Sequence, residues 1–246
     1  MFDYQAPENL LQDRIILVTG AGAGIGRAAA KAYAAHGATV ILLGRTLEKL
    51  EQVYDEIEAA GHPQPALVPL NLESAQEHDY IELANTLEQE FGRLDGILHN
   101  ASLLGVRTTI ESYYPVIWQQ VMQVNLNAPF MMTQILMPLL ERSNHASIVF
   151  TSSSVGRKAK AYWGAYGISK FATEGLMQTL ADELESVSKI RTNCINPGAT
   201  RTQMRADAYP AENPASVKSA EEIMPLYLYL MGDDSLEVNG QSLDAQ

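Results

Sequence analysis

Short runs of apolar and β-branched residues alternate along this chain with longer segments in which apolar positions recur every three or four residues. The short runs predict strands at 14–19, 39–43, 66–70, 95–98, 147–151, 189–195 and 241–243. The longer segments predict helices at 25–36, 47–60, 74–91, 115–141 with a break near 127–129, 164–186 and 220–231. Because helices join the first six strands, the pattern predicts an α/β fold with a mostly parallel sheet and helices on both faces.

The elements are evenly spaced and linker-like stretches are scarce, so we expect one domain over residues 1–246. A chain of this length supports a core without disulfides, and its sequence predicts no metal site. Its 17 basic and 29 acidic residues give a net charge of −12, so we expect neither nucleic acid nor an anionic membrane as a partner. The single cysteine, Cys194, is interpreted as a core residue and favours a reducing, cytoplasmic location. The N-terminus has no signal-peptide pattern, and we predict no membrane span.

A glycine-rich turn follows the first predicted strand and opens the first helix. Its residues Thr19, Gly20, Gly24 and Gly26 form the pattern Thr-Gly-x-x-x-Gly-x-Gly. Backbone N–H groups and the positive end of the helix can approach a pyrophosphate here, because glycine has no Cβ in the way. A merely tight strand–helix turn is the alternative, and Gly22 is interpreted as loop filler.

The end of the second predicted strand indicates which dinucleotide would bind. Dinucleotide folds usually place a carboxylate there for the ribose 2′-hydroxyl, or an arginine for a 2′-phosphate. Here Gly44 is in the expected acidic position, Arg45 follows, and the next carboxylate is Glu48. An arginine fork matches a phosphate dianion, so NADP(H) is favoured and NAD(H) is the alternative. A solvated arginine at the start of a loop is the structural alternative.

Tyr166 and Lys170 lie four residues apart in a predicted helix and therefore share one face. An ammonium near the phenol would lower the tyrosine pKa from about 10 toward about 7, which suits an acid or base at neutral pH. An exposed Tyr/Lys pair is the alternative. Ser153 follows a predicted strand, at the end of the sheet where α/β folds bind ligands. The spacing to Tyr166 favours Ser153 over Ser152 and Ser154, although a shift in register would exchange them.

The order and spacing of these motifs resemble the short-chain dehydrogenase/reductase family over the whole chain. The compact single-domain subgroup, and an uncharacterised bacterial branch of oxidoreductases within it, are the most similar. Further motifs that carry the resemblance are Asn100-Ala101, Asn125 and Pro197-Gly198-x-x-x-Thr202. The resemblance implies a Rossmann-type, doubly wound sheet of seven strands. It also implies an NAD(P)-dependent oxidoreductase that acts on a small carbonyl or alcohol substrate.

The resemblance assigns roles to four catalytic residues. Tyr166 would donate a proton to the carbonyl oxygen, and Ser153 would orient that oxygen. Lys170 would hold the nicotinamide ribose and lower the tyrosine pKa, while Asn125 would fix a water that relays protons to Lys170. An NADP-binding sensor without turnover is the alternative function, as is an isomerase or dehydratase on the same scaffold. The complete catalytic set argues against a sensor.

The cofactor contacts implied by the resemblance are spread along the chain. Asn71 replaces a usual aspartate but can still accept a hydrogen bond from the adenine. Ser102 replaces a usual glycine, and its neighbour His99 is interpreted as a packed strand-end residue. The full set comprises Gly20, Gly24, Ile25 and Gly26 at the pyrophosphate, Arg45, Asn71, Leu72, Asn100, Ala101 and Ser102 on the adenosine side, Tyr166 and Lys170 at the ribose, and Pro197, Gly198, Thr200 and Thr202 at the nicotinamide.

The substrate and the assembly are only loosely indicated. The segment 201–218 is the predicted lid, and its apolar residues suggest a partly hydrophobic substrate. The basic cluster of Arg157, Lys158 and Lys160 raises the hypothesis of an anionic substrate, with a solvated loop as the favoured alternative. Family members pair two long helices across subunits, here 126–141 and 164–186, so we expect a homodimer or homotetramer.

Overall fold

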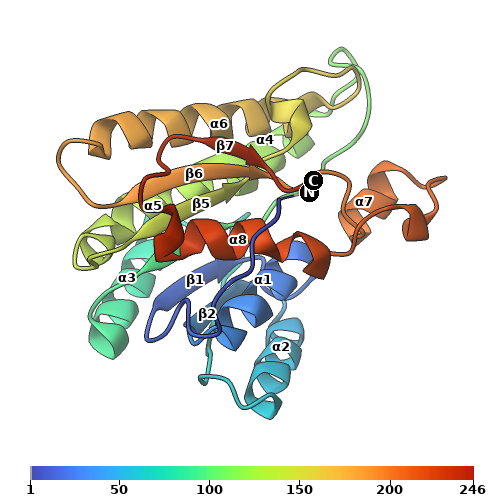
Figure 1. Ribbon diagram of the computed structural model, residues 1–246. Helices are drawn as coiled ribbons and strands as arrows, with labels where there is room; N and C mark the ends of the chain where they lie inside the picture. The colour runs from blue at the N-terminus through green and yellow to red at the C-terminus, as the bar shows by residue number, and fades with distance from the viewer. Residues whose placement is uncertain (1) are drawn as a thin grey trace.

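A single twisted sheet forms the centre of the computed structural model, which describes residues 2–246 (Figure 1). Its strands are all parallel and lie in the order β3-β2-β1-β4-β5-β6-β7. The predicted α/β, Rossmann-type sheet of seven strands is therefore confirmed. The strands are β1 (Ile15–Thr19), β2 (Thr39–Gly44), β3 (Ala66–Pro69), β4 (Gly96–His99), β5 (Ser147–Thr151), β6 (Arg191–Asn196) and β7 (Ser242–Asp244).

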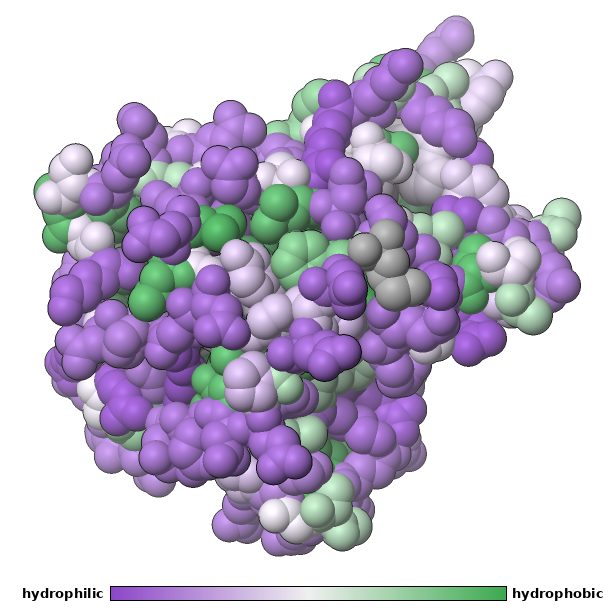
Figure 2. Space-filling view, in the orientation of Figure 1, coloured by the Kyte–Doolittle hydropathy of each residue, from purple (hydrophilic) through white to green (hydrophobic). Residues whose placement is uncertain are grey.

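Helices cover both faces of the sheet, which explains why the central strands are continuous apolar runs. In β1, Ile16 and Val18 face the layer formed by α1, α2 and α8, whereas Leu17 faces the layer of α3, α5 and α6. Figure 2 shows hydrophilic residues over most of one outer face, with small, separate apolar groups. The α-helices are α1 (Gly24–Ala35), α2 (Leu47–Ala59), α3 (Glu77–Phe91), α4 (Pro115–Met122), α5 (Ala128–Leu140), α6 (Gly164–Leu184), α7 (Gln203–Ala208) and α8 (Met224–Met231).

The long helical segment before β5 differs from its prediction. Instead of a break near 127–129, a π-helical turn, Gln123–Asn127, joins α4 directly to α5. The amide of Ala128 donates to the carbonyl of Gln123, five residues back, so the chain continues in a wider turn. Pro129, in the first turn of α5, has no amide proton to donate to the turn before it, which fits the local widening of the helix.

The strand order reverses between β1 and β4, so a crevice opens at the carboxyl ends of these two strands. The chain ends are also close to each other (Figure 1), and the amide of Phe2 donates to the carbonyl of Ala245. Among the described residues, no helix combines the length and apolar character needed to cross a bilayer. The crevice is where the predicted site residues should meet.

Candidate active site

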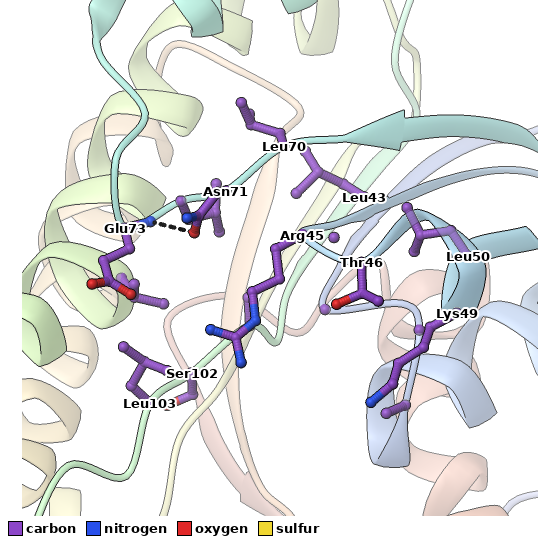
Figure 3. Close-up of a pocket in the computed structure, with 17 residues that line it drawn as sticks. Leu43, Arg45, Thr46, Lys49, Leu50, Leu70, Asn71, Glu73, Ser102 and Leu103 are labelled. Atoms are coloured by element: carbon purple, nitrogen blue, oxygen red, sulfur yellow. Dashed lines mark hydrogen bonds between the residues drawn. The ribbon is translucent and has the colours of Figure 1, made fainter.

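Two adjoining hollows at the carboxyl ends of the strands contain most of the predicted site residues. One, with a cavity volume of about 280 Å³, lies between the glycine-rich turn, the end of β2 and the segment after β3 (Figure 3). The other, with about 310 Å³, lies between the end of β5, α6 and α7. Both volumes are near the lower end of the range for small-molecule sites. The hollows form one cleft, because they share the lining residues Gly20, Ala23, Ala101 and Ser102.

The glycine-rich turn adopts a backbone that needs glycine. Gly20 and Gly24 have φ of +68° and +54°, in the left-handed region that other residues rarely adopt. A Cβ on Gly20 would lie 3.0 Å from the Cα of Ala101, and a Cβ on Gly26 would overlap the carbonyl of Gly20. The turn can therefore pack closely against the end of β4 while α1 starts at the cleft, with Ile25 in the cleft wall.

Asn100 ties three strand ends together at the floor of the cleft. Its amide donates to Thr19 Oγ1 (2.9 Å), and its Nδ2 donates to the carbonyl oxygen of Thr19 (3.3 Å). The hydroxyl of Thr151 donates to Asn100 Oδ1 (3.2 Å). The amide of Ala101 also donates to Thr19 Oγ1, at 3.0 Å. Thr19, at the start of the glycine-rich motif, thus braces β4 against β1, a role that the sequence pattern did not reveal.

Tyr166 and Ser153 meet in the second hollow, with Lys170 beside them. Ser153 is close enough to the Tyr166 phenol to lower the pKa of the phenol. The two neighbouring serines have other surroundings. The hydroxyl of Ser152 donates to Glu174 Oε1 (2.5 Å), and Ser154 is exposed. The structure therefore brings Ser153, rather than its neighbours, to Tyr166.

The pKa of the phenol differs from the prediction. Burial raises the pKa of Tyr166 to about 12, and Ser153 lowers it only in part. The ammonium of Lys170 donates to the carbonyl oxygen of Thr151 (2.7 Å) and lies 5.5 Å from the centre of the Tyr166 ring. Burial also lowers the pKa of Lys170 to about 8. The predicted fall toward 7 is therefore wrong for this structure, because desolvation outweighs the lowering effect of Ser153.

Asn125 lies behind the cleft, in the π-helical turn. Its Oδ1 accepts from the amide of Leu103 (2.7 Å), and its Nδ2 donates to the carbonyl of Leu103 (3.0 Å) and to Ser169 Oγ (3.0 Å). The side chain is buried and is used to hold the segment after β4, next to Ser102. Its role in proton relay stays a prediction.

The first hollow contains five of the six residues predicted for the adenosine side, whereas Asn100 lines the second hollow (Figure 3). Arg45 is exposed and points into the hollow, while Leu72 is buried in its wall. The Oδ1 of Asn71 accepts from the amide of Glu73 at 3.2 Å. Ser102 Oγ is buried and has no hydrogen-bond partner among the described residues. Further lining residues that the sequence reasoning missed are Thr46, Lys49 and Glu73.

The loop after β6 forms the opposite wall and includes Pro197, Gly198, Thr200 and Thr202. The hydroxyl oxygen of Thr202 accepts from the amide of Arg205 (3.1 Å) and so begins α7. A contact that the sequence did not indicate supports this loop. The Nε2 of Gln246 donates to the carbonyls of Pro197 (2.6 Å) and Ala199 (3.1 Å).

An apolar wall surrounds Tyr166 on the side away from the glycine-rich turn. Trp163 packs against Tyr166 and Tyr209, with ring centres 5.7 and 6.0 Å apart. The predicted lid provides Tyr209 and contains α7. It is braced by a two-bond ion pair from Arg205 to Glu212, with N–O distances of 2.6 Å. Other residues in this wall are Leu104, Met204 and Ala208.

The hypothesis that the basic cluster meets an anionic substrate is not supported. Arg157 donates to Asp244 Oδ1 (2.7 Å) and to Ser242 Oγ (2.7 Å), so it fastens the segment after β5 to β7. Lys158 and Lys160 are exposed, and the cleft lining includes none of the three cations.

His99 is a buried residue of the sheet, as its interpretation from the sequence proposed. Its ring stacks on Phe150 with centres 4.9 Å apart, and its Nε2 lies 2.9 Å from Thr133 Oγ1. Burial lowers the pKa of His99 to about 3, so the ring is neutral at neutral pH. The residue packs the end of β4 and does not line the cleft.

Known proteins are similar to this chain over its full length. The family model for short chain dehydrogenases matches residues 14–213. The uncharacterized oxidoreductase YciK of Escherichia coli K12 is 55% identical over 243 residues, covering 99% of this chain and 96% of its own. A solved short chain dehydrogenase structure from Pseudomonas syringae is 64% identical, with a TM-score of 0.98 and complete coverage of both chains.

A second solved structure was determined with a ligand. This short chain dehydrogenase from Shigella flexneri 2a, in complex with NADP, is 55% identical, with a TM-score of 0.95. The match covers 98% of the present chain and 100% of the other. From the family match and these similarities, we conclude that the chain belongs to the short chain dehydrogenase family of oxidoreductases, which act on CH–OH and C=O groups.

Proposed function

We propose that this chain is an NADP(H)-dependent oxidoreductase that interconverts a carbonyl and an alcohol group on a small, partly hydrophobic molecule. The observation that carries the proposal is the cleft itself. Tyr166, Ser153 and Lys170 lie together at one end, and Arg45 faces the other end beyond the glycine-rich turn. The complex of the Shigella flexneri relative with NADP supports the choice of cofactor.

The lining residues fit a dinucleotide. Gly20 and Gly24 leave the backbone of the turn open, and the unpartnered hydroxyl of Ser102 can bond to a polar ligand group. When bound, the dinucleotide would supply or accept the hydride. The glycine-rich turn would hold its pyrophosphate and Arg45 its 2′-phosphate, while the loop containing Pro197 and Thr200 would hold its nicotinamide.

Tyr166 is suited to act as the acid in carbonyl reduction. With a pKa near 12, its phenol is protonated at neutral pH and can transfer its proton to the carbonyl oxygen as that oxygen gains negative charge. The hydroxyl of Ser153 can donate to the same oxygen and orient it. The ammonium of Lys170 then stabilises the phenolate that remains. In alcohol oxidation the phenolate accepts the proton.

The wall around Tyr166 supports a partly hydrophobic substrate. Trp163, Met204 and Tyr209 present apolar surface, and the charge of Arg205 is paired with Glu212. A mainly apolar wall with a few polar groups at one point favours a hydrophobic body with one reacting carbonyl or hydroxyl. Closure of the segment 201–218 would exclude water from this end of the cleft.

Turnover tests the enzymatic part of the proposal directly. We expect NADPH oxidation, followed by its absorbance, with at least one member of a panel of aldehydes, diketones and 3-oxoacyl thioesters. A heat-denatured sample is the control for spontaneous oxidation. Tight NADPH binding without turnover across the whole panel would contradict the proposal and favour a sensor.

Arg45→Ala tests the choice of cofactor. We expect the variant to bind NADPH about 10- to 100-fold more weakly and NADH within about twofold of the parent, because a charge-assisted bond to the 2′-phosphate is lost. Titration calorimetry with both cofactors measures the two affinities. Arg142→Ala removes an exposed arginine that pairs with Glu88 and serves as the control. A variant that keeps the parent's preference for NADPH would show that the assignment of Arg45 is wrong.

A homodimer or homotetramer remains part of the proposal. The outer faces of α5 and α6 carry the exposed side chains of Phe130, Ile168 and Phe171. Exposed aromatic and aliphatic side chains on adjacent helices are typical of a surface that is covered by another subunit. These helices correspond to the segments 126–141 and 164–186 that the family resemblance indicates.

A further inference from the structure

The corner between β2 and α2 directs two cationic side chains into the first hollow. Arg45 and Lys49 both point into it (Figure 3). Both are exposed, and among residues 2–246 neither forms an ion pair, unlike Lys31, which pairs with Glu56. Two unpaired cations that face one hollow favour an anionic group between them.

The position of Lys49 depends on two glycines. A Cβ on Gly22 would lie 2.9 Å from the Cβ of Lys49, and a Cβ on Gly44 would lie 3.1 Å from Cδ2 of the buried Leu50. Because both Cβ atoms are absent, the first turn of α2 packs directly on the glycine-rich turn. Gly22 therefore has a packing role. Its interpretation from the sequence as loop filler is wrong.

The charges around the hollow are distributed unevenly. Its lining carboxylate, Glu73, lies on the opposite side with Asn71, and Glu73 Oε1 accepts from Gln120 Nε2 (2.8 Å). Arg45, Lys49 and the positive end of α2 lie on the other side. A phosphate monoester carries a charge of about −1.5 to −2 at pH 7, more than one arginine neutralises.

From this geometry we infer that Lys49 binds the 2′-phosphate of the adenosine ribose together with Arg45, and that Gly22 allows α2 to hold it there. The inference rests on the proposed NADP(H) specificity and adds a second specificity-determining residue to it. It also gives the glycine-rich turn a second role, because the turn supports the helix that carries the cation.

Calorimetric titration of the full chain with 2′,5′-ADP and with 5′-AMP tests the inference. The two probes differ only in the 2′-phosphate, and neither contains nicotinamide. We expect Lys49→Met to weaken 2′,5′-ADP binding about tenfold and to leave 5′-AMP binding within about twofold. Lys49→Arg should retain most of the affinity for 2′,5′-ADP. Lys189→Met, at another exposed lysine, changes the net charge equally and should leave both affinities unchanged.

Gly22→Ala tests the packing role independently of the lysine. The added methyl group must displace Lys49, so we expect the ratio of the two affinities to fall by about threefold or more even though the charge is unchanged. Thermal unfolding of each variant establishes that it is folded. A parent-like ratio in a folded Gly22→Ala variant would overturn the role of Gly22.

Three other outcomes would overturn the role of Lys49. Equal weakening of both probes by Lys49→Met would mean that the lysine acts on the 5′-phosphate. No change in Lys49→Met, with loss of preference in Arg45→Ala, would leave Arg45 as the determinant and the proposed cofactor intact. A parent protein with no preference for 2′,5′-ADP would contradict the proposed NADP(H) specificity itself.

Discussion

Tyr166→Phe should reduce the kcat for carbonyl reduction by about a thousandfold, which is within the range of general acid catalysis. The substitution removes a single oxygen atom, the one whose pKa Ser153 lowers and from which the proposed proton transfer starts. The ring stays in place against Trp163, 5.7 Å away. We therefore expect NADPH affinity to fall by about tenfold at most, through loss of one hydrogen bond to the ribose, and the free energy of unfolding to change by about 1 kcal/mol at most.

Tyr162→Phe is the matched control for this experiment. Tyr162 lies four residues earlier and is 56% exposed, outside the cleft lining. The control should keep the parental kcat with any substrate that the turnover panel identifies. Parental activity in Tyr166→Phe would mean that another group provides the proton, and the proposed mechanism would be abandoned.

Lys170→Met should lower kcat by about a hundredfold, since the variant loses the cation that stabilises the phenolate. Lys170 is 4% exposed, and its ammonium donates to the carbonyl oxygen of Thr151, which the methionine leaves without this partner. Burial of the ammonium is itself costly, so the two effects on stability oppose each other. Steady-state kinetics and thermal unfolding separate loss of catalysis from loss of fold.

The pH profile provides a second measurement on the same residue. Because burial lowers the pKa of Lys170 to about 8, the ammonium is present below this value and is lost as the pH rises through it. The kcat of reduction by the parent should therefore fall above about pH 8, and the Lys170→Met variant should lack this fall. If the same fall persists in the variant, a different group controls the profile.

The fold could be predicted well because its main signals are local. Strands buried on both faces, such as β1 with Ile16 and Leu17 in different layers, need apolar side chains at every position and so appear as short apolar runs. The helix stop at Gly92 also follows from local chemistry, because this residue has a positive φ of +74°. The exception is the π-helical turn at Gln123–Asn127, which was predicted as a break since no local pattern distinguishes the two.

From the residues alone, the site was predicted only where its members lie close together in the sequence, and the family resemblance provided the distant ones. The pair Tyr166 and Lys170 follows from helical spacing, but the raised tyrosine pKa does not, since it depends on burial by distant segments. The ion pair of Arg157 could not be predicted either, because its partner Asp244 is 87 residues away in the sequence. Lys49 was missed because Arg45 precedes α2 and Lys49 lies in its first turn, so helical spacing does not pair the two.

The contact between Gln246 and the loop at Pro197 affects how the protein can be labelled. A fluorophore attached at position 246 would lie against the loop at Pro197, which lines the second hollow, so its emission should respond when a ligand enters this hollow or the loop moves. The same dye on an exposed position of α3, such as Glu82, would report none of this. For the same reason, immobilisation through position 246 would act on this loop, and attachment through α3 would leave it undisturbed.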